Sequence, residues 1–289
     1  MIEIINAESK PAMIEKRTIL PWSQYKNGKN FTNGPKNFQT ETTTVWSFSD
    51  RGDWATHTPQ YRGNWSPRVV RNLLMLYSKP GDTVLDPMVG GGTTPVECKL
   101  LKRNSISIDI NPESINITRN RLSFDCDSND CFHKTFVGDA RNMVEIDDDS
   151  IDVVLTHPPY ANMIKYSDNV QGDLSRIDNY DVFFEEYQKI INESYRVLKP
   201  NGYCAVLIGD THKKSHYVPL SIKMLILYLQ TGFVLKEEII KKEWNCNSSF
   251  KYNQYPKTFL LTAHEHLFVF RKLTNAENLH YSSIDFLKE

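Results

Sequence analysis

The stretch VLDPMVGGGTTPVE, residues 84–97, joins a short apolar run to an acidic residue, three consecutive glycines and a helix-forming segment. The apolar run favours a buried strand. Gly90, Gly91 and Gly92 allow a tight turn in which the backbone approaches a ligand with no Cβ in the way. No Gly-Lys-Ser/Thr follows, so this is not the phosphate-binding loop of nucleoside triphosphatases. The carboxylate of Asp86 would repel a diphosphate and attract a cation.

Strands and helices alternate along the chain around this stretch. Apolar runs predict strands at 83–85, 105–110, 135–137, 151–155, 203–208, 234–241 and 264–271. Amphipathic patterns with capping residues predict helices at 66–77, 94–102, 112–124, 181–198 and 219–230. The alternation is typical of a mostly parallel sheet with helices on both faces, in which ligands bind beyond the carboxyl ends of the strands.

Carboxylates follow three of the predicted strands, at Asp86, Asp109 and Asp139. Asp109 ends the strand after the glycines, where a carboxylate binds the two hydroxyls of a ribose, although it could also simply cap a helix. Asp139 can accept a hydrogen bond from an exocyclic amino group such as that of adenine. Three acids suit a nucleoside that carries a positive charge and no phosphates. S-adenosylmethionine, with its sulfonium, amino acid group, ribose and adenine, fits this description.

A second stretch, VVLTHPPY at residues 153–160, runs from a predicted strand directly into two prolines. The prolines end the strand and stiffen the loop, so the carbonyl of Pro158 is held still. Neutral His157 offers a ring nitrogen as an acceptor, and Tyr160 offers a flat face for a base. An amino group on a nucleobase is a poor nucleophile because its lone pair is delocalised. Such acceptors would prepare it to attack a methyl sulfonium, without a metal.

Together the two stretches resemble the motifs of a known family. Asp86-Pro87-Met88-Val89-Gly90-Gly91-Gly92-Thr93-Thr94 resembles the cofactor motif, and His157-Pro158-Pro159-Tyr160 the catalytic motif, of the S-adenosylmethionine-dependent amino-methyltransferases of DNA. These enzymes make N4-methylcytosine or N6-methyladenine. The resemblance covers about residues 64–272. It implies a Rossmann-like methyltransferase fold with a seven-stranded, mostly parallel sheet, S-adenosylmethionine as cofactor, and double-stranded DNA from which the target base is flipped.

The resemblance also assigns site residues. It implies catalytic roles for His157, Pro158, Pro159 and Tyr160. Asn64-Trp65-Ser66-Pro67 resembles a further cofactor-contacting element, although Ser66 is equally well explained as a helix cap. The residues expected to bind the cofactor are Asp86, Pro87, Gly90, Gly92, Thr93, Thr94, Asp109, Ile110, Asp139, Ala140 and Ser66.

His157 departs from the family pattern, which has Asp, Asn or Ser at this position. The layout of Thr156-His157-Pro158-Pro159-Tyr160 is closest to the Thr-Ser-Pro-Pro-Tyr form of the cytosine enzymes, which favours cytosine N4 over adenine N6 as the methylated atom. Other interpretations remain open: an RNA amino-methyltransferase, or a non-catalytic DNA-binding subunit of a restriction or defence system. A dehydrogenase is disfavoured, because Pro-Pro-Tyr has no role there.

Two polar segments are candidates for DNA contact. Residues 161–180 follow the catalytic tyrosine and can form a lid or a DNA-contacting loop. Residues 241–257 mix basic and aromatic side chains, as phosphate contact and base stacking require, although a solvated hairpin connection would look the same. The individual candidates are Lys165, Tyr166, Lys241, Lys242, Trp244, Lys251 and Tyr252.

Bulk properties set outer limits on the protein. The 289 residues carry a formal net charge of −1, which leaves room for a local basic face only. No apolar run reaches the ~20 residues of a membrane span, and five cysteines without an export signal favour a cytoplasmic setting. Cys126, Cys131 and His133 lack a second ligand pair, so we expect no metal.

We expect an irregular arm at 1–44, one catalytic domain at 45–275 and a tail at 276–289. A restriction endonuclease or other defence subunit is a possible partner.

Overall fold

The computed structural model describes residues 3–5, 34–35, 37–61, 63–126, 130–160, 166–167, 169–213, 216–244, 260–274 and 276–277. The strands within them are β1 (Glu3–Ile5), β2 (Val45–Ser47), β3 (Thr83–Asp86), β4 (Asn104–Asp109), β5 (His133–Val137), β6 (Ile151–Thr156), β7 (Leu198–Ile208), β8 (Thr211–Lys213), β9 (His216–Val218), β10 (Phe233–Lys242) and β11 (His264–Lys272). The α-helices are α1 (Pro67–Tyr77), α2 (Thr93–Leu100), α3 (Pro112–Leu122), α4 (Tyr180–Val197) and α5 (Leu220–Thr231), with a short 3-10 helix at Leu174–Arg176.

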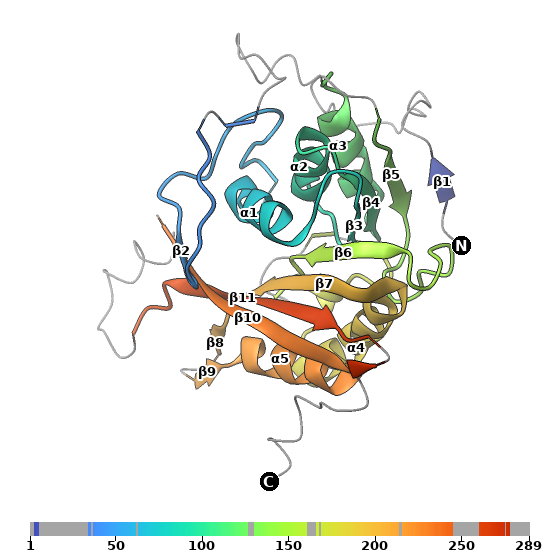
Figure 1. Ribbon diagram of the computed structural model, residues 1–289. Coiled ribbons are helices and arrows are strands. Elements are labelled where there is room, and N and C mark those ends of the chain that lie inside the picture. The colour runs from blue at the N-terminus through green and yellow to red at the C-terminus, as the bar shows by residue number, and fades with distance from the viewer. Residues whose placement is uncertain are drawn as a thin grey trace.

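The main sheet has the order β1-β5-β4-β3-β6-β7-β11-β10-β2, and β8 pairs with β9 apart from it. Strands β3 to β7 run parallel, and β11 runs antiparallel between β7 and β10 (Figure 1). The seven strands from β5 to β10 are the predicted ones, so the expected Rossmann-like methyltransferase fold is confirmed.

The two edge strands differ from the prediction. β1 pairs antiparallel with β5 and lies inside the segment 1–44 that the sequence predicts to be irregular. β2 pairs parallel with β10 at the other edge. Each edge strand has only three residues and stands apart from the alternation of strands and helices that predicts the central strands. They form because the edges of β5 and β10 present unpaired backbone groups.

Helices cover both faces of the sheet, with α1, α2 and α3 on one side and α4 and α5 on the other (Figure 1). Alternation along β6 supplies both cores: Val153 and Leu155 pack with the residues of α1, whereas Val154 packs with those of α4 and α5. All three side chains are at most 1% exposed. The central strands are therefore buried on both faces, as parallel strands usually are.

The buried carboxylate of Glu97 on α2 contacts side chains of the segment that precedes α1. Glu97 is fully buried and accepts hydrogen bonds from Trp54 Nε1 at 2.6 Å and Arg71 Nη1 at 2.8 Å. His57 Nε2 lies 2.7 Å from the same carboxylate. Burial lowers the pKa of His57, although Glu97 opposes the shift. This cluster fixes the start of the stretch that leads to Tyr61 and Asn64.

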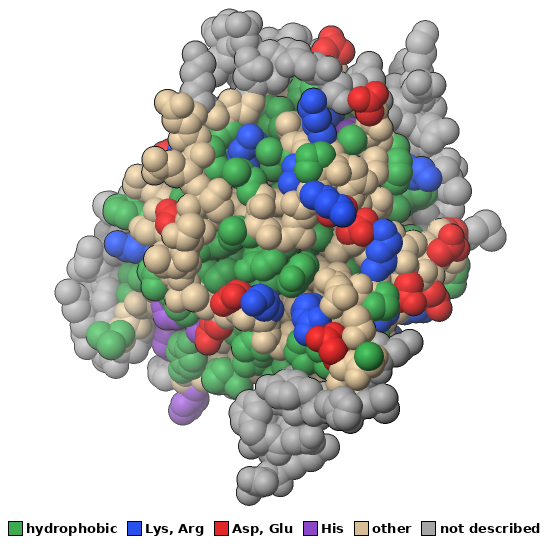
Figure 2. Space-filling model, viewed as in Figure 1, with side chains coloured by type: hydrophobic (Ala, Val, Ile, Leu, Met, Phe, Trp, Pro, Cys, Tyr) green, Lys and Arg blue, Asp and Glu red, His purple; other side chains and the backbone are tan. Residues whose placement is uncertain are grey.

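Basic and acidic side chains are interspersed over the face seen in Figure 2, consistent with a formal net charge of −1. Among the helices that the structure describes, none is both long and apolar enough to cross a membrane.

Two glycines with the same backbone conformation allow a test of the packing beneath the glycine loop. Gly92 (φ +82°) is the N-cap of α2, and a Cβ there would lie 2.8 Å from Thr118 Oγ1 and 3.1 Å from Thr118 Cα. Gly81 (φ +88°) has no atom within 4 Å of such a Cβ. We expect Gly81→Ala to lower the free energy of unfolding by about 1–2 kcal/mol, for the left-handed conformation alone. Gly92→Ala should lower the free energy of unfolding by about 1–3 kcal/mol more than Gly81→Ala does, because the added Cβ would overpack against Thr118. Urea unfolding measures both, and equal losses would contradict this packing.

Candidate active site

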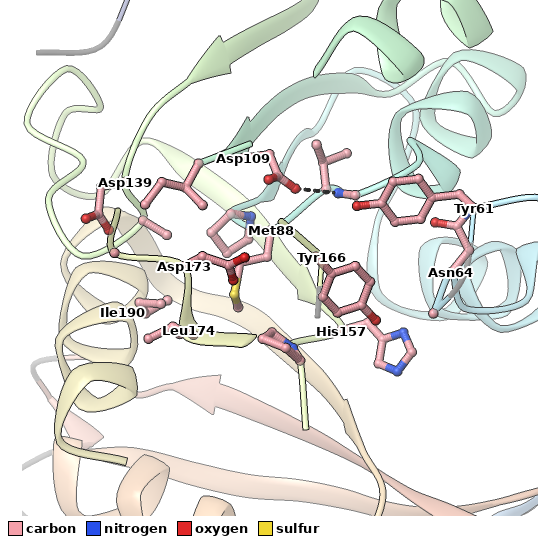
Figure 3. A pocket seen from close by; sticks show the side chains of 18 of the residues that line it. Tyr61, Asn64, Met88, Asp109, Asp139, His157, Tyr166, Asp173, Leu174 and Ile190 are labelled. Atoms are coloured by element: carbon pink, nitrogen blue, oxygen red, sulfur yellow. Dashed lines mark hydrogen bonds between the residues drawn. The ribbon is translucent and has the colours of Figure 1, made fainter. Parts of the chain in front are cut away.

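The carboxyl ends of four neighbouring strands line one pocket. Following the sheet order β5-β4-β3-β6, its wall includes Asp139, Asp109, Pro87 and His157. Figure 3 shows Asp139 and His157 at opposite ends of the pocket, with Asp109 between them. Three strand spacings separate β5 from β6, which makes the row roughly 14 Å long. The sheet therefore arranges residues from distant parts of the chain in one line.

Asp109 holds the glycine loop against the end of β4. Its Oδ2 accepts from Gly90 N at 2.8 Å, and its Oδ1 accepts from Asn111 N at 2.9 Å. Burial raises the pKa of Asp109 to about 6, although the two backbone donors oppose the shift. The carboxylate lines the pocket and retains lone pairs that can accept from a ligand.

Asp86 lies beneath the loop rather than in the pocket wall. It accepts from Thr94 Oγ1 at 2.5 Å and from Met88 N at 3.1 Å, and burial raises its pKa to about 7. Gly92 and Thr93 are likewise absent from the residues that line the pocket. These members of the predicted cofactor set therefore lie outside the pocket lining, whereas Pro87, Gly90, Asp109, Ile110, Asp139 and Ala140 line it.

Asp139 is held by a neighbouring arginine. Arg141 Nη2 lies 2.6 Å from Asp139 Oδ2, and the backbone N–H of Arg141 donates to Oδ1 at 3.0 Å. Arg141 also pairs with Glu186 on α4, which fixes the guanidinium. Asp139 lines the pocket, and Arg141 sets the orientation of its carboxylate.

The opposite wall includes Asn64, from the predicted cofactor-contacting element, and three residues that the sequence did not connect with the cofactor: Tyr61, Tyr166 and Asp173. Tyr61 and Tyr166 stack with ring centroids 6.1 Å apart. Asn64 Oδ1 accepts from Gly91 N at 3.1 Å, which holds the glycine loop from above. Asp173 caps the 3-10 helix through Ser175 N at 2.8 Å and lines the pocket. From the sequence, Tyr166 was predicted only as a DNA contact, and Tyr61 and Asp173 were not predicted as individual site residues.

A second pocket adjoins the first. Both are lined by Gly63, Asn64, Trp65, His157 and Tyr166. The second pocket is further lined by Phe48, Ser49, Arg51, Ser66, Pro158, Tyr160, Lys241, Lys242, Glu243, Trp244 and Glu265. Ser66 thus borders the second pocket, where its Oγ accepts from Arg68 N at 3.2 Å as the N-cap of α1. His157 and Tyr166 stand where the two pockets meet.

The imidazole of His157 is packed on both sides. Its ring stacks on Trp65, with centroids 5.9 Å apart and planes inclined by 27°, and its Nε2 lies 2.8 Å from Tyr160 Oη. Burial lowers the pKa of His157 to about 4; Glu265 and the Gly63 backbone oppose the shift, and the charge of Lys241 adds to it. The ring is therefore neutral at pH 7.

Tyr160 connects His157 to an ion pair on the last two strands. Tyr160 Oη donates to Glu265 Oε1 at 2.5 Å, and Lys241 Nζ donates to Glu265 Oε2 at 2.7 Å. Burial alone would raise the pKa of Glu265, but the charge of Lys241 holds it below its usual range. Burial and Glu265 raise the pKa of Tyr160 well above its usual value. Glu265 has no motif signal in the sequence, where it is one residue of an ordinary strand.

Of the predicted DNA contacts, Tyr166, Lys241, Lys242 and Trp244 line the second pocket. Lys242 Nζ lies 4.4 Å from the ring centroid of Trp244, whose Nε1 donates to Ser47 Oγ at 3.1 Å. The side chain of Trp244 remains 45% exposed at the mouth. The ammonium of Lys241 is engaged by Glu265. The candidates Lys165, Lys251 and Tyr252 lie outside the described residues.

The first pocket fits S-adenosylmethionine by its chemistry. The ribose, the adenine amino group and the ammonium of the cofactor are all donors, and Asp109, Asp139 and Asp173 offer acceptors along the wall. Met88 and Leu174 supply apolar contact between them.

Known methyltransferases match most of this chain. A family model described as DNA methylase matches residues 2–120 and 151–288, and one described as methyltransferase domain matches 85–206. Type II methyltransferase M.MjaI of Methanocaldococcus jannaschii is 27% identical over 179 residues, covering 52% of this chain and 58% of the relative. Type II methyltransferase M.MthZI of Methanothermobacter thermautotrophicus is 26% identical over 159 residues, covering 48% and 44%. The chain thus spans about half the length of these curated relatives.

Among solved structures, a SAM-dependent methyltransferase from Methanosarcina mazei aligns with a TM-score of 0.47 at 15% identity, covering 70% of this chain and 98% of that one. The DNA methylase model spans both motifs and most of the chain. This chain therefore belongs to the DNA methylase family, the S-adenosylmethionine-dependent family that its two motifs resemble.

Proposed function

We propose that this chain transfers a methyl group from S-adenosylmethionine to the exocyclic amino group of a DNA base flipped out of the duplex. The observation that carries the proposal is the position of His157. It borders both a pocket lined by strand-end carboxylates and a second pocket lined by Trp244 and Lys242. A group held there can reach a ligand on either side.

The cofactor, when bound in the first pocket, supplies a methyl group activated by a positively charged sulfur. Asp109 would accept from the ribose hydroxyls and Asp139 from the adenine amino group, while Met88 and Leu174 exclude water from the middle of the pocket. Gly90 leaves room for the nucleoside to lie close to the loop.

Neutral His157 and the Pro158 carbonyl would accept the hydrogens of the target amino group. This withdraws the nitrogen lone pair from the ring and directs it toward the methyl carbon. As the new carbon–nitrogen bond forms, the bond between the methyl carbon and the sulfur would break and leave S-adenosylhomocysteine, while the nitrogen, now positive, would lose one proton to its acceptor. A histidine with a pKa of about 4 is uncharged throughout the neutral range and is always ready to accept.

The second pocket would take the flipped base. Tyr160 and Trp244 offer stacking faces, and Arg51 and Lys242 offer positive charge for the flanking phosphates. We favour cytosine N4 as the acceptor, because the Thr-His-Pro-Pro-Tyr layout is closest to that of the cytosine enzymes. We also propose a role in site-specific DNA modification, in keeping with the names of the type II relatives, with a restriction endonuclease or other defence subunit as partner.

The modified base identifies the reaction. After incubation of the chain with S-adenosylmethionine and duplex DNA, digestion to nucleosides and mass spectrometry should reveal N4-methylcytosine. The same assay with transfer RNA serves as the control and should give no methylated nucleoside. N6-methyladenine would reassign the target, and methylation of the RNA alone would reject DNA as the substrate.

His157→Ala should separate binding from chemistry. Because His157 accepts from the target amino group, we expect the variant to bind cofactor nearly as well as wild type while its turnover falls by roughly 10²–10⁴-fold. Isothermal titration with S-adenosylhomocysteine and a single-turnover methylation assay measure the two quantities. Unchanged turnover in the variant would remove His157 from the mechanism.

Asp109→Asn should have the reverse effect, weakening cofactor binding first. Loss of a charged acceptor predicts a roughly 10- to 100-fold weaker affinity. The folded pKa of about 6 lies above the ordinary value of 3.8, so the carboxylate is protonated as pH falls through 6. Wild-type affinity should therefore fall between pH 7 and pH 5, whereas that of Asp109→Asn should stay level. Asp152→Asn, at the opposite end of β6, is the matched control, and a level wild-type profile would contradict the assignment.

A further inference from the structure

A hydrogen-bonded chain crosses from the last two strands to the catalytic loop. Lys241 Nζ lies 2.7 Å from Glu265 Oε2, Glu265 Oε1 lies 2.5 Å from Tyr160 Oη, and Tyr160 Oη lies 2.8 Å from His157 Nε2. Glu265 is only 9% exposed. We call these four residues the relay. The motif residues account for two of them, and the mechanism above uses neither Lys241 nor Glu265.

The proton positions along the relay follow from one end to the other. Glu265 is ionised beside Lys241 and can only accept. Tyr160 keeps its single proton, because burial and Glu265 raise its pKa, and the carboxylate receives that proton in a hydrogen bond. Tyr160 Oη is then an acceptor toward the imidazole. His157 must supply the hydrogen at Nε2, since two facing lone pairs at 2.8 Å would repel each other.

The other ring nitrogen is thereby left without a proton. Neutral imidazole carries one N–H, so Nε2–H makes Nδ1 the lone-pair nitrogen. Nδ1 of His157 is buried and has no hydrogen-bond partner among the residues that the structure describes. The Gly63 backbone raises the pKa of the ring, but no hydrogen bond of normal geometry joins it to Nδ1. An unpaired buried acceptor is unfavourable until a donor arrives.

We propose that the Lys241–Glu265 ion pair, acting through Tyr160, fixes the Nε2–H tautomer of His157 and so makes Nδ1 the atom that accepts from the target amino group. This assignment rests on the proposed function. Glu265 and Lys241 are positioning residues, because they act on the imidazole through Tyr160. The stacking of His157 on Trp65 completes the restraint by setting the plane of the ring.

The tautomer can be observed without any activity. In the full chain labelled with ¹⁵N-histidine at pH 7.5, long-range proton–nitrogen correlation distinguishes Nε2–H from Nδ1–H, and the signals absent from His157→Gln identify the residue. We expect the Nε2–H pattern. An Nδ1–H pattern would overturn this inference alone, whereas absence of methyl transfer from every nucleic acid tested would overturn the proposed function and leave the tautomer assignment standing.

Substitutions in the relay test its effect on catalysis. Glu265→Gln removes the charge, and Tyr160→Phe removes the connecting hydroxyl but keeps the ring and the ion pair. In each variant we expect both tautomers of His157 to be populated and kcat to fall roughly 10-fold or more, with KM for cofactor and DNA little changed. Glu238→Gln is the matched control, because Glu238 pairs with His266 at 3.0 Å on the same two strands and lies outside the relay. Wild-type kcat together with an unmixed Nε2–H signal in both relay variants would refute the inference.

Discussion

The site depends on the parallel pairing of β3 with β6. Val84 pairs with Val153 and Leu85 with Val154, although α2, β4, α3 and β5 lie between these strands in the sequence. The chain leaves β3 toward β4 on one side, and β6 continues toward β7 on the other. The connections therefore diverge above the strand ends and cannot fill the space between them. Burial of Leu85 and Val154 on one face holds the two strands in register, and so places the glycine loop beside the proline loop.

Sequence patterns were sufficient for everything that depends on a strand and the loop that follows it. The periodicity located the seven central strands, and motif order located the two loops. Motif membership did not distinguish the residues that line the pocket from those outside its lining, such as Asp86 and Thr94. The far wall was harder to predict, because Tyr61 and Asp173 reach the pocket through irregular segments. No local pattern reports where such a segment folds back.

The pKa values of three buried carboxyl groups near the site are shifted in different directions. Burial raises the pKa of Asp86 to about 7 and that of Asp109 to about 6, so each is less stable as an anion in the folded chain than in the unfolded one. Their ionisation therefore opposes folding as pH rises from about 4 through these values. Glu265 has the opposite behaviour, because Lys241 compensates its charge. A cationic nucleoside beside Asp109 would offset the free-energy cost of ionising that buried carboxyl group. The permanent charge of Glu265 needs no ligand.

The different charge states of these acids suggest how a histidine could serve at the first position of the proposed catalytic loop. Asp, Asn or Ser presents an acceptor oxygen there whatever the proton positions around it. An imidazole presents an acceptor only at whichever nitrogen lacks the proton, and a free ring would interconvert. His157 therefore requires a fixed acceptor on its other side. The Lys241–Glu265 pair provides one through Tyr160, at the junction of β10 and β11. A histidine at this position is thus chemically tied to Glu265, which lies more than one hundred residues away in the sequence.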